Sequence, residues 1–232
     1  MKFVKMQGTG NDYIYVNCLN EQLENPEKAA VRLSDRHFGI GSDGLILICK
    51  SGDADFRMDM YNVDGSRAEM CGNGIRCLGK YVYDHGLTEK ELVTVETLSG
   101  IKTLKLITEG GKCCSVIVDM GIPELLADII PVIWKSNSVI NRELTIEDEV
   151  YKITCVSMGN PHVIIFVEDV DKIDIERLGP LFENNAIFPN RVNTEFVQVM
   201  DSGRLKMRVW ERGSGETLAC GTGACAAVVA AV

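Results

Sequence analysis

Two copies of a short cysteine motif are the residues of this chain best suited to chemistry. Cys71 and Cys220 are each followed by Gly-x-Gly, and they lie 149 positions apart (220 − 71). Each opens a stretch of helical character, so each thiol is expected at a helix N-terminus, where unpaired N–H groups and partial positive charge gather. Such a site lowers the pKa of a thiol and binds carboxylates. Each copy predicts a thiol base beside an anion-binding turn.

One copy of Cys-Gly-x-Gly would be typical of a tight turn with a buried cysteine. Two copies at matching positions favour a shared function instead. One thiolate can remove a proton from one face of a carbon while the opposite thiol delivers a proton to the other face. Cysteine suits both roles because its pKa is near neutrality and is easily shifted. The pattern predicts inversion at a carbon next to a carboxylate.

The same offset relates further features, which indicates an internal repeat. Gly10-Asn11 matches Gly159-Asn160, and a helical stretch at 25–38 matches another at 174–187. We predict an N-terminal half, 1–120, which carries Cys71, and a C-terminal half, 121–232, which carries Cys220. The predicted strands lie at 13–16, 45–49, 56–61, 92–96, 102–107, 113–119, 162–167, 195–199 and 205–210, and the predicted helices at 26–38, 73–83, 175–182 and 222–232. Strands outnumber helices without strict alternation, which favours an α+β fold.

The repeat also predicts elements that the sequence does not contain. The first half continues after its second helix into three strands, whereas the sequence stops at Val232, inside the matching helix. We therefore expect an intact protein to carry roughly 40 further residues, the counterparts of those strands.

Composition excludes several classes of protein. The chain has 24 Lys and Arg against 33 Asp and Glu, a formal charge of −9, and no basic cluster, so a nucleic-acid binder is not expected. No apolar run is long enough to span a membrane, and the N-terminus lacks the apolar core of a signal peptide. Nine cysteines without C-x-x-C spacing predict free thiols in a reducing cytoplasm, and no metal site.

Several motifs, in order and at the expected spacing, resemble the diaminopimelate epimerase family. They are Gly8-Thr9-Gly10-Asn11-Asp12, Tyr61-Asn62-Val63-Asp64-Gly65-Ser66, Glu69-Met70-Cys71-Gly72-Asn73-Gly74-Ile75-Arg76-Cys77, Gly159-Asn160-Pro161-His162, Arg191-Val192-Asn193-Thr194-Glu195-Phe196 and Glu211-Arg212-Gly213-Ser214-Gly215-Glu216-Thr217-Leu218-Ala219-Cys220-Gly221-Thr222-Gly223. The resemblance implies a cofactor-independent epimerase that interconverts LL- and meso-2,6-diaminopimelate in lysine and peptidoglycan precursor biosynthesis. It implies two pseudo-symmetric halves, each a curled, mainly antiparallel sheet around a central helix, with the active site in the cleft between them, and a possible homodimer.

The resemblance also assigns roles to residues. Cys71 and Cys220 would be the two catalytic thiols, and His162 and Glu211 would assist their proton exchange. The reacting α-carboxylate would lie near Gly72, Asn73, Gly221 and Thr222. The distal end of the substrate would be held by Asn11, Asn62, Asn160, Asn193, Glu211 and Arg212. Arg212 suits a carboxylate because its guanidinium binds in a bidentate way.

The sequence departs from the family pattern at a few positions. Gly44 stands where some members have a Gln that contacts substrate, so one contact is lost. Gln7 stands where His is frequent, and Ser214 replaces a common Ala. None of these positions is next to a predicted catalytic thiol.

Three alternatives stay open. A proline or hydroxyproline racemase would use the same fold, but its substrate has one amino-acid end and no use for the Glu211–Arg212 pair. A redox or metal-binding protein could use Cys71 and Cys220 as a disulfide pair or as ligands, although two thiols do not complete a tetrahedral zinc site. Metal content and thiol titration would identify it. A non-catalytic binding module is disfavoured because both thiols are present.

Overall fold

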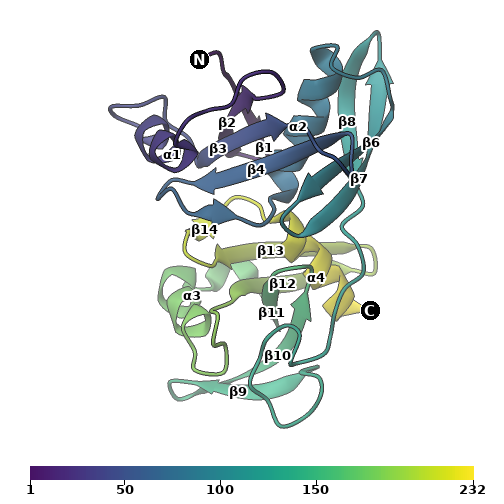
Figure 1. Cartoon of the computed structure of the whole chain (residues 1–232). Helices are drawn as coiled ribbons and strands as arrows, with labels where there is room; N and C mark the ends of the chain where they lie inside the picture. The colour runs from purple at the N-terminus through teal and green to yellow at the C-terminus, as the bar shows by residue number, and fades with distance from the viewer. The chain divides into compact units, whose positions relative to one another are not determined.

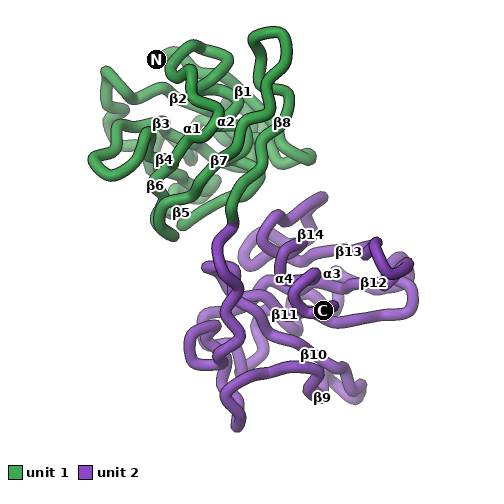
Figure 2. Tube along the Cα trace, turned by 90° about the vertical axis from the view of Figure 1, so that its right-hand side faces the viewer, with its two compact units in different colours: residues 1–119 green, residues 120–232 purple.

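A computed structural model describes residues 1–232 as two compact units, Met1–Asp119 and Met120–Val232 (Figure 2). Both units combine helices with a mainly antiparallel sheet, which confirms the α+β prediction. Among the helices of this chain, none has the length and apolar character that a membrane crossing requires.

Unit 1 is an eight-stranded sheet with two helices (Figure 1). Its elements are β1 (Val4–Gly8), β2 (Asn11–Asn17), α1 (Pro26–Ser34), β3 (Gly44–Cys49), β4 (Phe56–Asn62), β5 (Arg67–Ala68), α2 (Gly72–Asp84), β6 (Leu92–Thr97), β7 (Gly100–Glu109) and β8 (Lys112–Val118). The strand order is β1-β2-β3-β4-β6-β7-β8, and β5 pairs with β4.

Unit 2 is a six-stranded sheet with the order β14-β13-β12-β11-β10-β9. Its elements are β9 (Arg142–Ile146), β10 (Glu149–Ser157), β11 (Pro161–Phe166), the 3₁₀ turn η1 (Val170–Lys172), α3 (Ile175–Glu183), β12 (Asn193–Asp201), β13 (Arg204–Glu211), β14 (Gly215–Thr217) and α4 (Gly221–Ala231).

The two units share one topology. In unit 1, β2 pairs antiparallel with β1 and parallel with β3, and β4 pairs antiparallel with β3 and β5. In unit 2, β11 has the same relations to β10 and β12, and β13 to β12 and β14. Helices α1 and α3 are offset by 149 residues at both ends (175 − 26 and 183 − 34). The repeat inferred from the sequence is therefore a repeat of structure.

In unit 1 the sheet is curled around α2, whose apolar side chains pack against β2, β3, β4, β6, β7 and β8. Alternate residues of a strand face opposite sides of a sheet. Accordingly Tyr13 and Tyr15 of β2 pack towards α2, while Ile14 and Val16 pack towards α1 on the other side. Helix α1 begins with Pro26, whose fixed φ suits the first turn of a helix.

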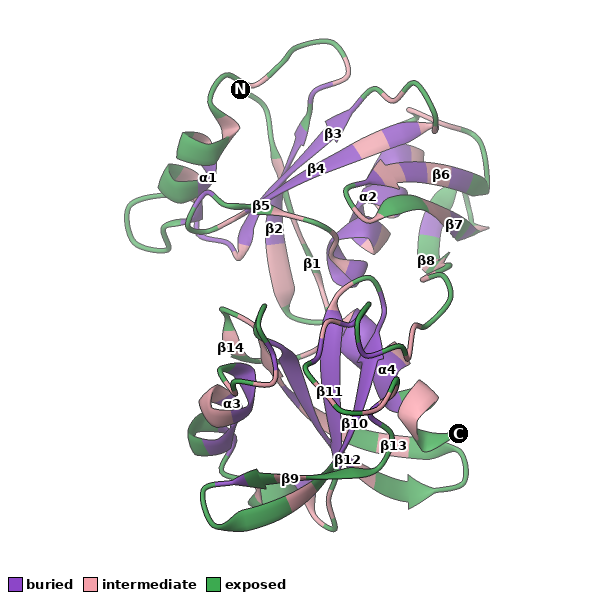
Figure 3. Cartoon of the chain, turned by 60° about the horizontal axis from the view of Figure 1, so that its bottom comes forward, coloured by how far each residue is buried: buried purple, intermediate pink, exposed green.

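Unit 2 repeats this arrangement with α4 and α3 on the two sides of the sheet (Figure 3). Ile164 of β11 and Val197 of β12 pack towards α4. Their neighbours Val163, Ile165 and Phe196 pack towards α3. Helix α4 is therefore the counterpart of α2, and its buried face is made of small residues.

Two expectations about the elements were wrong. The helix predicted over 26–38 ends at Ser34, because the Asp35 side chain accepts hydrogen bonds from the backbone N–H groups of His37 and Phe38 and turns the chain. Phe38, expected on the apolar face of that helix, is exposed. The strands β1, β9 and β10 were not predicted, because charged and polar residues interrupt their alternation. The strands β5 and β14 were also not predicted, because they are only 2 and 3 residues long.

Candidate active site

In unit 1, Cys71 is the N-cap residue of α2. Its backbone is extended (φ −134°, ψ 117°), and its Sγ accepts a hydrogen bond from the N–H of Gly74 at 3.3 Å. This is the N-cap geometry normally made by Ser, Thr or Asp, with sulfur in place of oxygen. It places the thiol among the first N–H groups of the helix, as the sequence predicted.

A network of amides surrounds Cys71. The Cys71 thiol donates to Asn11 Oδ1 at 3.3 Å, and Asn11 Nδ2 donates to Asp43 at 2.7 Å. The Asn73 side chain donates to the same Asn11 oxygen at 3.5 Å, and its own oxygen accepts from Arg76 at 2.7 Å. Asn11 and Asn73 are thus brought next to the thiol, on the α2 side of β2.

Two further residues predicted for unit 1 lie at the ends of secondary-structure elements. Gly72 opens α2, and its carbonyl accepts from Arg76 at 3.0 Å. Asn62, at the end of β4, donates to the Ser66 hydroxyl at 3.0 Å.

In unit 2, Cys220 is the N-cap residue of α4 and repeats the geometry of Cys71. Its backbone is extended (φ −116°, ψ 116°), and its Sγ accepts from the N–H of Gly223 at 3.3 Å. Thr222 adds a contact between Oγ1 and the same sulfur at 3.3 Å. Gly221, the first residue of α4, places no side chain over the backbone of this turn.

A buried polar cluster lies beside Cys220. His162 of β11 is fully buried, with Nδ1 2.7 Å from Glu195 Oε1 and Nε2 3.0 Å from Asn160 Oδ1. Asn160 Nδ2 in turn donates to Thr222 Oγ1 at 3.3 Å. The structure therefore brings together His162, Asn160, Thr222 and Cys220, all of which the sequence singled out.

Glu211 also belongs to the surroundings of Cys220. It lies at the end of β13, accepts a hydrogen bond from the Thr217 hydroxyl and interacts with the Cys220 thiol. Burial raises the pKa of Glu211, and the nearby Glu195 raises it further. A carboxyl whose pKa is shifted towards neutrality suits exchange of a proton with a thiol.

Asn193 and Arg212 meet through the backbone. Asn193 Nδ2 donates to the Pro161 carbonyl at 2.8 Å, and its Oδ1 accepts from the N–H of Arg212 at 2.9 Å. Asn193 therefore ties the start of β11 to the end of β13. The Arg212 guanidinium donates to the Asn190 carbonyl at 3.1 Å and forms no ion pair with a carboxylate of this chain.

The expected lowering of a thiol pKa at a helix N-terminus does not hold for Cys220. Burial raises the pKa of its thiol, and the carboxyl groups of Glu211 and Glu195 raise it further. The Thr222 hydroxyl and the Gly223 N–H oppose this rise without cancelling it. The sequence could not show this, because it did not reveal how deeply the start of α4 is buried. Cys220 therefore rests as a thiol.

One group of side chains has metal-ligand chemistry. Donor atoms of His162, Glu195 and Cys220 lie within 4.8 Å of one another. However, Nδ1 and Oε1 are in direct hydrogen-bond contact at 2.7 Å. Two ligands of a tetrahedral zinc ion would be roughly 3.3 Å apart, given Zn–N and Zn–O distances near 2 Å. The geometry is that of a hydrogen-bonded cluster.

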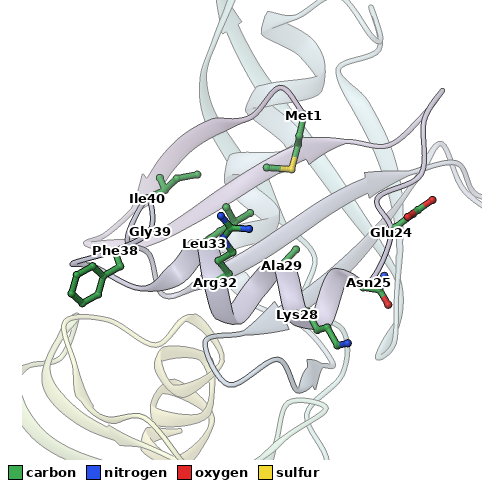
Figure 4. Close-up of a pocket in the computed structure, with 10 residues that line it drawn as sticks. All are labelled: Met1, Glu24, Asn25, Lys28, Ala29, Arg32, Leu33, Phe38, Gly39 and Ile40. Carbon is green, nitrogen blue, oxygen red and sulfur yellow. The ribbon is translucent and has the colours of Figure 1, made fainter.

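Residues that the sequence did not single out complete the two clusters. Tyr13 lies beside Cys71 and Asn11, and burial raises the pKa of its hydroxyl. Glu195 is fully buried against His162. Glu195 stands in the motif Arg191–Phe196 that carries the family resemblance, but the sequence assigned it no role. A separate pocket over α1, lined among others by Met1, Arg32 and Phe38, contains none of the predicted site residues (Figure 4).

Two solved structures have the same fold as this chain. A hydroxyproline epimerase from Agrobacterium vitis superposes with a TM-score of 0.68 at 14% identity, covering 99% of this chain and 76% of that one. A PhzF-family phenazine biosynthesis protein from Bacillus anthracis gives a TM-score of 0.63 at 19% identity, covering 97% and 78%. At this level of identity the likeness establishes the fold, and it confirms the two-half architecture.

Comparison of sequences is more specific. Diaminopimelate epimerases from Methanococcus maripaludis and Acetivibrio thermocellus are each 57% identical to this chain over 232 residues, covering all of it and 84% and 83% of their own lengths. One from Desulfovibrio desulfuricans is 53% identical and covered to 83%. The sequence model of the family, described as diaminopimelate epimerase, matches residues 3–126 and 154–232. The chain belongs to the diaminopimelate epimerase family.

Proposed function

We propose that this chain interconverts LL- and meso-2,6-diaminopimelate with Cys71 and Cys220 as its two acid–base groups, without a cofactor. The observation that carries the proposal is the repeated thiol geometry. In both units a cysteine caps the equivalent helix and accepts an N–H hydrogen bond at 3.3 Å from the third residue of that helix. A reaction that treats both faces of one carbon alike accounts for two matched thiols.

The proposed reaction moves one proton in each of two steps. A thiolate takes the α-proton, and the electron pair of the broken C–H bond spreads onto the adjacent carboxylate. The opposite thiol then gives its proton to the other face of the same carbon, which leaves an inverted α-carbon and a new thiolate. Unpaired N–H groups at the starts of α2 and α4 would stabilise the charge on the carboxylate, together with Asn73 and Thr222.

The surroundings of Cys220 support a role as the proton donor of the resting enzyme. Burial and two carboxyl groups raise the pKa of its thiol, so it holds a proton. Before Cys220 can act as the base in the opposite direction, that proton must leave. Glu211 contacts the thiol, and its own raised pKa makes it the acceptor that we propose, with His162 in support.

The distal end of the substrate would be bound by polar groups that do not react. Arg212 forms no ion pair within the chain, so its charge is available for the distal carboxylate. Glu211 can accept from the distal ammonium group, and amides can both donate and accept. We assign Asn11, Asn62, Asn160 and Asn193 to this end of the substrate. Cytoplasmic location and a homodimer are parts of the same proposal.

Proton NMR of LL-diaminopimelate in D₂O tests the proposal. The enzyme should remove one α-proton signal and produce the meso isomer. Cys71→Ala and Cys220→Ala should each abolish this change. Cys225→Ala, a control one turn further along α4, should retain it. Turnover by either active-site variant at the wild-type rate would contradict the proposal, and so would exchange of proline or hydroxyproline in place of diaminopimelate.

A further inference from the structure

The buried carboxyl of Glu195 is not used by the proposed mechanism. Glu195 lies on β12, on the side of the sheet that packs against α4, and no part of it is exposed. Its Oε1 is 2.7 Å from His162 Nδ1, while Oε2 is buried without any hydrogen-bond partner. A buried carboxyl with one unpartnered oxygen lowers stability, so a functional reason for it should exist.

The hydrogen bonds that lead from Glu195 to Cys220 have one consistent direction. Asn160 Oδ1 can only accept, so His162 Nε2 must carry a hydrogen and donate it. Asn160 Nδ2 then donates to Thr222 Oγ1 at 3.3 Å. Having accepted there, the Thr222 hydroxyl has its hydrogen free for Cys220 Sγ at 3.3 Å. Either atom of this last contact can be the donor, and the sulfur accepts the hydrogen when Cys220 is a thiolate.

The direction of these hydrogen bonds depends on how Glu195 contacts His162. When Nε2 carries the hydrogen of a neutral imidazole, Nδ1 is an acceptor, so the contact at 2.7 Å requires a hydrogen between Nδ1 and Oε1. The pair therefore holds two hydrogens, one on Nε2 and one shared with Glu195. A residue that could neither share nor donate a hydrogen at this position would free His162 to adopt the other tautomer.

The absence of a side chain at Gly223 allows Glu195 to pack against the first turn of α4. A Cβ added at Gly223 would lie 2.4 Å from Glu195 Oε1, so only glycine lets the first turn of α4 lie this close to the carboxyl. The same turn supplies the N–H that binds Cys220 Sγ. The Glu195 carboxyl and the Cys220 thiol are therefore both positioned by Gly223.

We propose that Glu195 is a positioning residue: it holds His162 with a hydrogen on Nε2, and through Asn160 it directs the Thr222 hydroxyl at Cys220. The expected effect on catalysis rests on the proposed two-cysteine reaction. The expected positions of the hydrogens on His162 do not depend on it. Because Glu195 is fully buried, we expect it to make no direct contact with substrate. Its loss should slow proton transfer at Cys220 without weakening substrate binding.

Nitrogen NMR of the substrate-free enzyme tests whether His162 Nε2 carries a hydrogen. The chain has only three histidines, so His37→Asn and His85→Asn variants assign the His162 signals. We expect Nε2 to carry a bonded hydrogen in the wild type and in Glu195→Gln, whose amide can donate to Nδ1. A bare Nε2 in the wild-type enzyme would overturn the proposal, whatever the activity.

Steady-state kinetics test whether the loss of Glu195 slows proton transfer at Cys220. Glu195→Met, of similar volume but without a donor, should lower kcat by about 10- to 100-fold, the loss expected for one broken buried hydrogen-bond series. Its KM should stay within about twofold, because no substrate contact is removed. Glu195→Gln should restore most of kcat.

Asp59→Asn is the matched control, because Asp59 is a buried carboxyl of unit 1 that pairs with Arg57 and Arg67. It should change neither kcat nor the His162 signals. An active wild type with a fully active Glu195→Met would refute the positioning role alone. An inactive wild type with the expected Nε2 signal would refute the proposed function alone.

Discussion

Replacement of Gly223 by Ala tests how tightly the start of α4 is fitted. The added Cβ would lie 2.4 Å from Oε1, 3.1 Å from Cδ and 3.2 Å from Cγ of Glu195. Glu195 is fully buried and bonded to His162, so its side chain has no free space to move into. Either the carboxyl leaves His162 or α4 moves away from the sheet.

The magnitude follows from the kind of clash. Overpacking of a buried site costs about 1–3 kcal/mol. Alanine regains part of this, because it is up to about 1 kcal/mol better than glycine in a helix. A net loss of about 1 kcal/mol should lower Tm by about 3–6 °C for a unit of this size. Because Cys220 Sγ is bound by the same turn, kcat should fall as well.

Gly74→Ala is the matched control in unit 1. Its Cβ would meet Ile46 Cδ1 at 2.6 Å, but that atom is the end of an apolar side chain that can rotate. Thermal unfolding followed by circular dichroism, with kcat measured on the same samples, compares the two variants. Equal Tm for Gly223→Ala and Gly74→Ala would refute the argument that Glu195 is held in place.

Three further predictions concern charge. Arg212→Ala should raise KM for diaminopimelate by about tenfold or more with little change in Tm, since the guanidinium makes no internal ion pair; an unchanged KM in initial-rate assays would remove Arg212 from the binding site. Burial raises the pKa of Glu211 above the ordinary value of 4.5, so its carboxyl favours the folded state below pH 4.5 and loses that contribution as the pH rises. Glu211→Gln should therefore have a higher Tm than the wild type at pH 8 and a similar Tm at pH 4, and the opposite trend in melting curves would contradict the burial argument. Burial raises the pKa of Asp12, but Arg36 and Lys5 outweigh it and lower the value to about 2. Stability from Asp12 is then present above pH 3.8 and lost as the pH falls through 2, so Asp12→Asn should cost no more than about 1 kcal/mol at pH 7, and a difference in Tm that persisted at pH 2 would refute the assignment.

Much of the fold could be predicted because the sequence repeats. One offset aligned both cysteine motifs, and it also aligns Pro26–Ser34 with Ile175–Glu183 in the structure. Strands with continuous apolar residues, such as Leu45–Cys49, were predicted nearly to the residue. The strands β9 and β10 were missed because charged residues such as Glu143, Glu149 and Lys152 interrupt their alternation, and because β9 and the first half of β10 are mostly exposed.

The site was predictable only in part. Local motifs identified both thiols and their helices, because N-cap geometry depends on a few adjacent residues. Glu195 was not identified, since its role depends on a partner 33 positions earlier, on the parallel strand next to it. The direction of the Cys220 pKa was wrong for the same reason: burial by distant residues outweighs the local effect of the helix. The strands expected after α4 stay a prediction.

The fate of the α-hydrogen tests the two-thiol reaction most directly. LL-diaminopimelate is incubated with enzyme in D₂O, and the reaction is stopped while little product has formed. Because the proton is taken by one thiol and the new hydrogen comes from the other, which has exchanged with solvent, the meso product should carry deuterium at the inverted carbon. The recovered LL substrate should still carry protium. Product that retained protium, or substrate deuterated as fast as product forms, would contradict a reaction with two separate thiols.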